Sequence, residues 1–303
     1  MAKKPIAMEI RWLARQEIDK VKWNSCIHYA NNGNVFGYLW YLDHVAKEWD
    51  ALVEGDYESV FPLVWRKHWL RGKELYQPAW MRELGLYSIH VLSTARQKAF
   101  LEAIPPEYGQ VDIALNEQNL SPAVEPFRLE TRSNFQLLLD RPYEEIAEGF
   151  SRDLFPTLER AERSGLRSTS GLSPERIAEF YRRNGQGKQR ESRSHALLRI
   201  MYNALHRGWG FSTGVTDENG ELLAVDFFLY SHRKAVSLTP VYSVRGLDLG
   251  APEHLCHAIV RSHAGRPLIL DFNTADGRVP RAFGAQENEF YHLRRDSRIL
   301  GVF

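Results

Sequence analysis

Residues 209–242, WGFSTGVTDENGELLAVDFFLYSHRKAVSLTPVY, contain three apolar runs separated by two short polar segments. The runs 209–216, 221–230 and 234–242 are rich in β-branched and aromatic side chains, which favours strands. DENG and the pair His232-Arg233 are tight-turn sequences, so neighbouring strands should be antiparallel. We therefore predict a three-stranded meander.

The residues around this meander predict a mixed sheet with helices. After it come a predicted loop, SVRGLDLGAPEH, a helix to about His263 and the apolar strand PLILDF. Because a helical crossover connects them, this strand can lie parallel to the strand at 234–242. Upstream, Ser173-Pro174 suits the start of a helix, residues 195–208 have one apolar helical face, and Pro156 should interrupt or restart a helical region.

The first half repeats this order less clearly. Its predicted helices are residues 17–28, 38–47 and 93–104, and its predicted strands are residues 49–55, 56–65, 74–78, 84–89 and 110–115. A chain of 303 residues exceeds the usual size of a single core. We predict two α+β domains, residues 1–133 and 134–303, each with a mixed, mostly antiparallel sheet flanked by helices.

Composition limits the classes of function. Lys+Arg 39 against Asp+Glu 38 gives no overall field for nucleic acid or anionic lipid. The two cysteines, Cys26 and Cys256, have no CxxC spacing, and the histidines lack convincing metal spacing, so we assign no metal. The chain shows no signal peptide and no membrane span. A cytoplasmic protein is expected, and its oligomeric state is open.

The segment 241–250 is the best phosphate-binding candidate. A strand ending at Val241 and Tyr242 leads through Ser243, Arg245 and Gly246 to Gly250 and a helix N-terminus. Such a terminus offers free N–H groups and a positive dipole end to an anion. The alternative is an ordinary strand-to-helix connection, since Asp248 would oppose an anion.

Two carboxylates interrupt apolar strands. Asp271 ends PLILDF and could activate or position an amine, with Asn273 beside it, or could cap the turn NTADG. Asp226 lies within LLAVDFFLY and could equally face solvent.

Two aromatic segments of the first half suggest contact surfaces. WRKHWLRGK (residues 65–73) could bind nucleic acid, but a hairpin tip with solvated charges is favoured given the balanced charge. In YQPAWMRELGLY, Gln77, Trp80 and Arg82 offer a flat apolar wall with polar anchors for an acceptor.

Several stretches resemble a known family. GFSRDLFPTLERAERSGL and LILDFNTADGRVPRAFGAQENEFYHL resemble segments of FemAB-like proteins, which are built from two GNAT-type acyltransferase domains. IRWLARQEIDKVKWNSCI and YLWYLDHVAKEWDALVEGDYESVFPLVW resemble the start of bacterial GNAT proteins of similar length. The resemblance covers most of the chain and rests on the order of these stretches, because no single motif is highly specific. It implies tandem GNAT-like domains, the second binding the donor.

The resemblance also implies a mechanism in which an amine attacks an acyl-CoA thioester directly. Backbone N–H groups at the end of the 234–242 strand would stabilise the oxyanion, and Tyr291 would protonate the departing thiolate. The aminoacyl-tRNA-dependent members carry a lysine just before the Phe-Gly turn, whereas RVPRAFG here has a proline near that position and a cation at Arg281. Acetyl-CoA or another acyl-CoA is therefore the expected donor. The alternatives are an aminoacyl-tRNA-dependent ligase acting on cell-wall precursors and a non-catalytic binding module.

Overall fold

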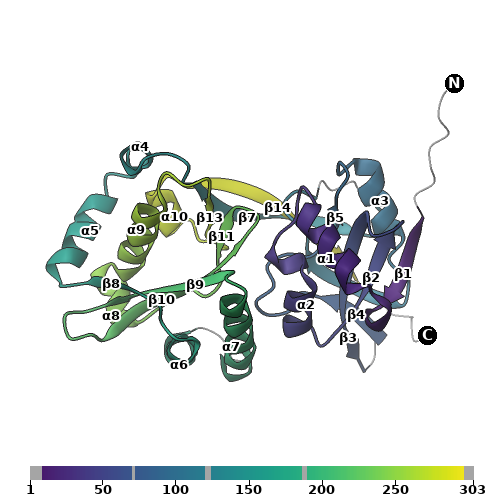
Figure 1. Ribbon diagram of the computed structural model, residues 1–303, viewed down its shortest axis with the longest axis horizontal. Coiled ribbons are helices and arrows are strands. Elements are labelled where there is room, and N and C mark those ends of the chain that lie inside the picture. Colours follow the sequence, from purple (N-terminus) through teal and green to yellow (C-terminus); the bar gives the residue numbers. More distant parts are fainter. Residues whose placement is uncertain (1–8, 70–71, 120–123, 186–189, 297–303) are drawn as a thin grey trace, which may run out of the picture. The chain divides into compact units, whose positions relative to one another are not determined.

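The computed structural model describes residues 9–69, 72–119, 124–185 and 190–296 (Figure 1). The chain forms two compact units, unit 1 (Met1–Arg132 with Glu289–Phe303) and unit 2 (Ser133–Asn288). The second domain was predicted to span residues 134–303. The segment from Glu289 instead groups with unit 1, because the end of β14 (Gln286–Arg295) pairs with β6 (Tyr108–Ala114).

The unit 1 sheet has the order β1-β2-β3-β4-β6-β14. Its other strands are β1 (Ile10–Ala14), β2 (Glu48–Glu54), β3 (Ser59–His68), β4 (Gly72–Tyr76) and the short β5 (Tyr87–Ser88), which pairs with β3. Neighbours are antiparallel except β4 and β6, which run parallel. The predicted hairpin at Gly55 is confirmed, since β2 and β3 pair from Glu54 opposite Ser59.

The unit 1 helices are η1 (Arg15–Glu17), α1 (Lys20–Tyr29), η2 (Val35–Gly37), α2 (Leu39–Val45) and α3 (Thr94–Glu102). Ser93, the first residue of the predicted helix 93–104, caps α3, with its hydroxyl accepting from the Arg96 N–H at 3.2 Å. Trp23, Tyr41 and Phe61 are among the large side chains fully buried in this unit.

The unit 2 sheet has the order β7-β13-β11-β10-β9-β8. Its strands are β7 (Arg128–Leu138), β8 (Arg167–Ser170), β9 (Gly210–Thr216), β10 (Leu222–Ser231), β11 (Lys234–Ser237), β12 (Val241–Tyr242), which pairs with β10, and β13 (Ile269–Asp271). The predicted meander is β9-β10-β11. The parallel pairing of the last strand with the meander is also confirmed, with Val236 of β11 opposite Asp271 of β13.

The unit 2 helices are α4 (Tyr143–Ala147), α5 (Leu154–Arg163), α6 (Pro174–Asn184), α7 (Arg190–His206), α8 (Val244–Leu249), α9 (Ala251–His263) and α10 (Arg278–Ala282). Figure 1 shows α5 and α9 on one side of the unit 2 strands and α6 and α7 on the other. Leu158 of α5 and Ile259 of α9 join Phe228 of β10 in one apolar core. The predicted sheet flanked by helices is thus confirmed.

Two local predictions need correction. The strand at 234–242 is interrupted between β11 and β12, because Pro240 has no N–H for the ladder. The predicted loop after it contains α8, with Ser243 as its N-cap and Gly250 in the left-handed region at its end. The predicted restart of the helical region at Pro156 is confirmed, since the break between α4 and α5 precedes Pro156, which lies in the first turn of α5, where its missing N–H costs nothing.

Candidate functional site

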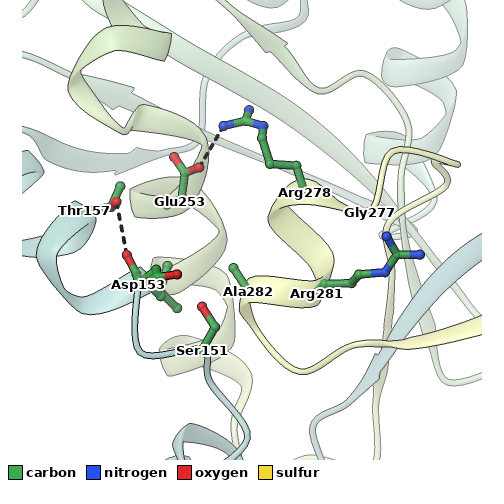
Figure 2. A pocket seen from close by; sticks show the side chains of 9 residues that line it. Ser151, Asp153, Thr157, Glu253, Gly277, Arg278, Arg281 and Ala282 are labelled. Carbon is green, nitrogen blue, oxygen red and sulfur yellow. Dashed lines mark hydrogen bonds and ion pairs between the residues drawn. The ribbon is translucent and has the colours of Figure 1, made fainter.

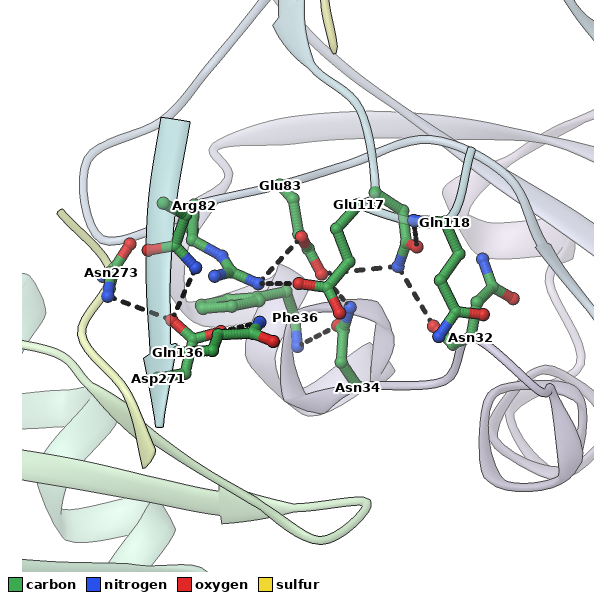
Figure 3. A network of polar contacts seen from close by, with 12 residues as sticks. Asn32, Asn34, Phe36, Arg82, Glu83, Glu117, Gln118, Gln136, Asp271 and Asn273 are labelled. Carbon is green, nitrogen blue, oxygen red and sulfur yellow. Dashed lines mark hydrogen bonds and ion pairs between the residues drawn. The ribbon is translucent and has the colours of Figure 1, made fainter. Parts of the chain in front are cut away.

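A buried carboxylate ends β13. Asp271 is fully buried, and its oxygens accept hydrogen bonds from Asn134 Nδ2 (3.0 Å), Gln136 Nε2 (2.8 Å) and the Asn273 backbone N–H (3.0 Å). Both amide side chains come from β7, the antiparallel neighbour of β13. Figure 3 shows Asp271 with Gln136 and Asn273. Because a buried carboxylate is tolerated only when its oxygens are hydrogen-bonded, these donors fix its position.

Asn273 joins the carboxyl ends of the two parallel strands. Its side chain Nδ2 donates to the Ser237 carbonyl at 2.9 Å, and its backbone adopts a left-handed φ of 50°. The hydrogen bond from the Asn273 N–H to Asp271 is the turn-capping contact that the sequence offered as an alternative role for this carboxylate. In open sheets with parallel strands, ligands bind outside these carboxyl ends.

Asp226 lies in the middle of β10 and is only 3% exposed. The solvated position that the sequence left open for it is therefore wrong, because the neighbouring strands and α9 cover this part of β10. Its carboxylate accepts from Ser237 Oγ (2.6 Å), the Phe227 N–H (2.7 Å) and the Thr239 N–H (3.0 Å). Burial raises the pKa of Asp226 to about 7, and these hydrogen bonds oppose the increase.

A pocket of about 440 Å³ lies in unit 2 at the start of α9 (Figure 2). It is bounded by the beginning of α5, the first turn of α9 and the short helix α10. The lining residues are Ser151, Asp153, Leu154, Thr157, Glu253, Gly277, Arg278, Arg281 and Ala282. The first turn of a helix leaves N–H groups without intrahelical partners, so its dipole end favours an anionic ligand at this position.

Two arginines of α10 border this pocket. Arg278 Nη1 lies 3.1 Å from Glu253 Oε1, with side chains 57% and 11% exposed, respectively. Arg281 Nη2 lies 2.7 Å from Glu287 Oε2, and its guanidinium carbon is 4.8 Å from the centroid of the Phe135 ring. Figure 2 shows Arg278 extending toward Glu253 and Arg281 extending away from it. Each arginine is paired with a carboxylate, and Asp153 and Glu253 also line the pocket, so a phosphate bound at the start of α9 would compete with these carboxylates for the two guanidinium groups.

The predicted phosphate loop is a packed structural element. The Ser243 hydroxyl accepts from the Gly246 N–H at 3.0 Å and so caps α8. Arg245 Nη1 lies 2.6 Å from Asp217 Oδ2 and 2.6 Å from Glu221 Oε2. Because two carboxylates surround this guanidinium, it would have to leave them before it could bind a phosphate.

Gly246 and Gly250 each allow close packing. A Cβ at Gly246 would lie 2.4 Å from the Leu223 carbonyl oxygen of β10. Gly250, with φ of 81°, separates α8 from α9, and a Cβ there would lie 2.9 Å from Thr157, which lines the pocket. Gly250 therefore borders the pocket wall, whereas Gly246 packs on the sheet.

We expect Gly246→Ala to lower the free energy of unfolding by about 1–3 kcal/mol, because the new methyl group meets a backbone carbonyl that cannot move away alone. Urea unfolding measures this loss. Val244→Ala is the control, since Val244 is 78% exposed in the same helix and should change stability little. An unchanged stability with weakened donor binding would instead support the predicted phosphate-binding role of this loop.

The remaining predicted donor residues form β12. Val241 is buried and pairs with Val225, and Tyr242 is half-buried and pairs with Ala224. Burial raises the pKa of Tyr242 well above its usual value. The phenol of Tyr242 is therefore neutral at physiological pH and cannot act as a base.

Tyr291 lies on the part of β14 that belongs to unit 1 and is half-buried. Its carbonyl accepts from the Leu115 N–H at 2.8 Å, which extends the pairing of β14 with β6. The proposed acid role of its side chain stays a prediction.

The predicted acceptor residues of unit 1 are engaged within that unit. Gln77 Oε1 accepts from the Ala114 N–H (3.0 Å) and its Nε2 donates to the Met81 carbonyl (2.7 Å). Trp80 is half-buried with a left-handed φ of 66°.

Arg82 belongs to a buried polar network of unit 1 (Figure 3). Its Nη2 lies 3.0 Å from Glu83 and 3.5 Å from Glu117, and Asn34 and Asn116 also hydrogen-bond Glu83. An acceptor bound through Gln77 or Arg82 would have to replace contacts of this kind.

Neither known family models nor curated proteins match this sequence. Solved structures do match the fold over nearly its whole length. They include FemX (TM-score 0.61, 14% identity, covering 94% of this chain and 97% of that chain) and a tandem GNAT protein from the clavulanic acid biosynthesis pathway (0.56, 11%, 94% and 98%). L-PGS from Bacillus licheniformis is similar as well (0.55, 12%, 92% and 92%). The chain has the tandem GNAT fold.

The two GNAT units share one strand order. Counted from the outer edge, the orders are β1-β2-β3-β4-β6-β14 in unit 1 and β8-β9-β10-β11-β13-β7 in unit 2. In both units neighbours among the first four strands are antiparallel, the fourth and fifth are parallel, and the sixth is antiparallel to the fifth. In both units the fourth strand is followed by a short strand that pairs back to the third, β5 in unit 1 and β12 in unit 2. The intervening residues are 77–86 in unit 1 and 238–240 in unit 2.

In unit 1, residues 77–86 cover the carboxyl ends of the parallel strands β4 and β6. Gln77 bonds the end of β6 through the Ala114 N–H, and the Leu84 N–H donates to the Ala114 carbonyl at 2.8 Å. Leu84 and Leu115 form a parallel bridge. The chain itself thus fills the carboxyl end of the parallel pair in unit 1, which leaves unit 2 as the stronger candidate for donor binding.

Sequence reasoning missed several residues of the unit 2 site. Glu253 and Thr157 were not predicted as site residues, because the starts of their helices were not located at these positions, and Arg278 was given no role within the segment RVPRAFG. The sequence did contain a signal for Ser237, because a polar residue within an apolar strand, two residues before Thr239, is unusual.

The described part of the chain contains no group of three or more metal-binding side chains placed to hold an ion. Among the described helices, none has the length and apolar character needed to cross a membrane.

Proposed function

We propose that this protein is an N-acyltransferase that transfers an acyl group from acyl-CoA to an amine, and that unit 2 binds the donor. The observation that carries the proposal is the pocket at the start of α9, with Arg278 on its wall. CoA carries phosphates, which suit a helix N-terminus and an arginine.

A direct attack of the amine on the thioester is favoured over an acyl-enzyme. Burial raises the pKa of Cys26 to about 12 and that of Cys256 well above its usual value. Because the thiolate is the nucleophilic form, neither cysteine is activated to accept an acyl group.

The proposed roles of the reacting groups follow from the strand ends. The amine would approach the carboxyl ends of β11 and β13, where Asp271 fixes Asn273 and Asn273 meets Ser237. The proposed oxyanion donors are backbone N–H groups at the end of the 234–242 segment, after Pro240, because the Leu238 and Thr239 N–H groups are already engaged and Pro240 has none. The Tyr291 phenol is proposed as the acid that protonates the departing thiolate, as the family resemblance implies.

An aminoacyl-tRNA donor is the second candidate. The cations on the pocket, Arg278 and Arg281, belong to the α10 segment in which the aminoacyl-tRNA-dependent relatives place a lysine. Arg245, the cation expected to hold a CoA pyrophosphate, is instead held by two carboxylates. A third possibility is a binding module without catalysis.

Thermal shift with acetyl-CoA, longer acyl-CoAs, free CoA and charged tRNA tests the donor class. A donor at 100 times its Kd should stabilise the fold by about 2.7 kcal/mol, whichever class is correct. Release of free thiol on addition of primary amines then tests transfer. Binding of acyl-CoA without thiol release would favour the binding module, and stabilisation by charged tRNA alone would favour the ligase.

A further inference from the structure

The interruption between β11 and β12 is held by one carboxylate. β11 ends at Ser237 and β12 begins at Val241, and both strands pair with β10. Across this break Asp226 accepts hydrogen bonds from Ser237 Oγ and from the Thr239 N–H. The Leu238 N–H still reaches the Phe227 carbonyl at 2.9 Å.

These contacts replace the ladder where proline removes it. Pro240 cannot donate a backbone hydrogen bond, so the strand cannot continue in register. An isolated buried carboxylate in an apolar strand is costly unless it is fully hydrogen-bonded. Asp226 meets this condition only while residues 237–239 keep their present conformation, so the carboxylate and the break stabilise each other.

The break is also part of the candidate reaction site. Ser237 donates to Asp226 through its hydroxyl and accepts from Asn273 Nδ2 through its carbonyl. Asn273 is in turn held by Asp271. A continuous chain of hydrogen bonds, buried at Asp226 and partly buried at Asn273, thus runs from the middle of β10 to the end of β13.

Thr239 adds an independent observation. Its side chain is 2% exposed, and among the described residues Oγ1 has no hydrogen-bond partner. A buried hydroxyl without a partner lowers the free energy of unfolding, so Thr239 at the break is not explained by its contribution to stability.

We propose that Asp226 is a positioning residue for acyl transfer, which holds residues 237–239 in the conformation against which the donor's acyl group lies. The inference rests on the proposed function. Asp226 does not touch the reacting atoms, and it acts through the backbone of the break and through Ser237.

The titratable groups that face Asp226 are Tyr242 on β12 and Cys256 on α9. Glu253 on α9 and Arg278 on α10 pair with each other and face Tyr242. All three contacts of Asp226 are donors to it, so the ionised form is the one that accepts from all of them. With a pKa of about 7 for Asp226, transfer should rise as the pH increases through neutrality.

The test compares Asp226→Asn with the wild type. The asparagine oxygen can still accept from the two backbone N–H groups, but more weakly than a carboxylate, and the amide nitrogen cannot accept from Ser237 Oγ. We therefore expect a folded protein in which residues 237–239 are held less firmly and whose kcat falls at least about tenfold, while its KM for the donor changes less. The rise of kcat/KM near pH 7 should disappear. Thr213→Val is the matched control, because Thr213 lies opposite Asp226 on β9, is buried and hydrogen-bonds the Thr169 carbonyl.

Stability gives a second readout with a definite sign. Burial raises the pKa of Asp226 above its usual value of 3.8, so its contribution to stability is full below pH 3.8 and is lost as the pH rises through about 7. The melting temperature of Asp226→Asn relative to wild type should therefore increase from pH 5 to pH 8.5.

Amide hydrogen exchange at Leu238 and Thr239, measured without donor, separates this inference from the proposed function. The positioning role is supported if exchange is faster in Asp226→Asn than in Thr213→Val and if the rise of kcat/KM near pH 7 is lost in Asp226→Asn. The role is overturned if that rise persists or if both variants exchange at the same rate. If wild type transfers no acyl group to any amine, the proposed function fails, and the exchange rates alone then decide whether Asp226 holds the break.

Discussion

Replacing Asp271 with alanine is expected to lower the free energy of unfolding by about 3–5 kcal/mol, because one buried and two partly buried donors would lose their acceptor together. Asn134 Nδ2, Gln136 Nε2 and the Asn273 N–H all point at this carboxylate. The change also removes the contact that fixes Asn273, so acyl transfer should be lost even where the protein remains folded.

Urea unfolding and transfer kinetics measure the two effects. Asp271→Asn keeps one oxygen for Asn134 and Asn273, so it should cost less stability than alanine while still impairing transfer. Asp276→Ala is the control, since Asp276 is exposed in the same segment and caps the Arg278 N–H. A stability loss in Asp271→Ala no larger than in Asp276→Ala would contradict the assigned network.

Removing Arg278 should weaken donor binding about tenfold or more, because a charge-assisted contact to phosphate is typically worth about 1.5–3 kcal/mol. Two effects combine at this position. The variant loses a cation at the pocket, and it leaves Glu253, whose side chain is 11% exposed, as an unpaired negative charge beside the phosphates. Arg281→Ala should have a smaller effect, because its guanidinium extends away from Glu253 (Figure 2).

Calorimetry with the best-bound donor from the thermal shift series measures these affinities. Arg278→Ala combined with Glu253→Gln should recover part of the affinity if repulsion by Glu253 causes part of the loss. Arg245→Ala is the matched arginine control and should change donor affinity less than about twofold, since Asp217 and Glu221 already hold this side chain. The opposite ranking would place the phosphates at residues 241–250, the segment that contains α8, as the sequence predicted.

Local patterns predicted most elements of unit 2. Apolar runs rich in β-branched and aromatic residues, separated by turn residues, predicted β9, β10 and β11. The pair Ser173-Pro174 predicted the start of α6, where the Ser173 hydroxyl accepts from the Arg176 N–H. These features depend on neighbours within a few residues, so one sequence contains the information. Two elements were missed for local reasons: β8 is a mostly exposed strand with little apolar alternation, and Gly246 inside α8 suggested a loop.

The candidate site was only half predictable. Asp271 and Asn273 were singled out because polar residues at the end of an apolar strand are visible in the sequence. The donors to Asp271 come from β7, more than a hundred residues earlier, so their pairing is set by sheet order. The pocket brings together α5, α9 and α10 in the same way.

The sequence by itself determined which residues carry charge, which segments have the apolar pattern of strands, and where helices begin, because these properties are local. Only the tertiary structure decided the state of each charge. It buried Asp226 against the break in residues 238–240, and it paired Arg245 with Asp217 and Glu221 of the preceding hairpin. It also placed Arg278 beside Glu253 at the pocket. The cost or benefit of a charge depends on its burial and its partners within a few ångströms, and both are fixed by segments distant in the chain.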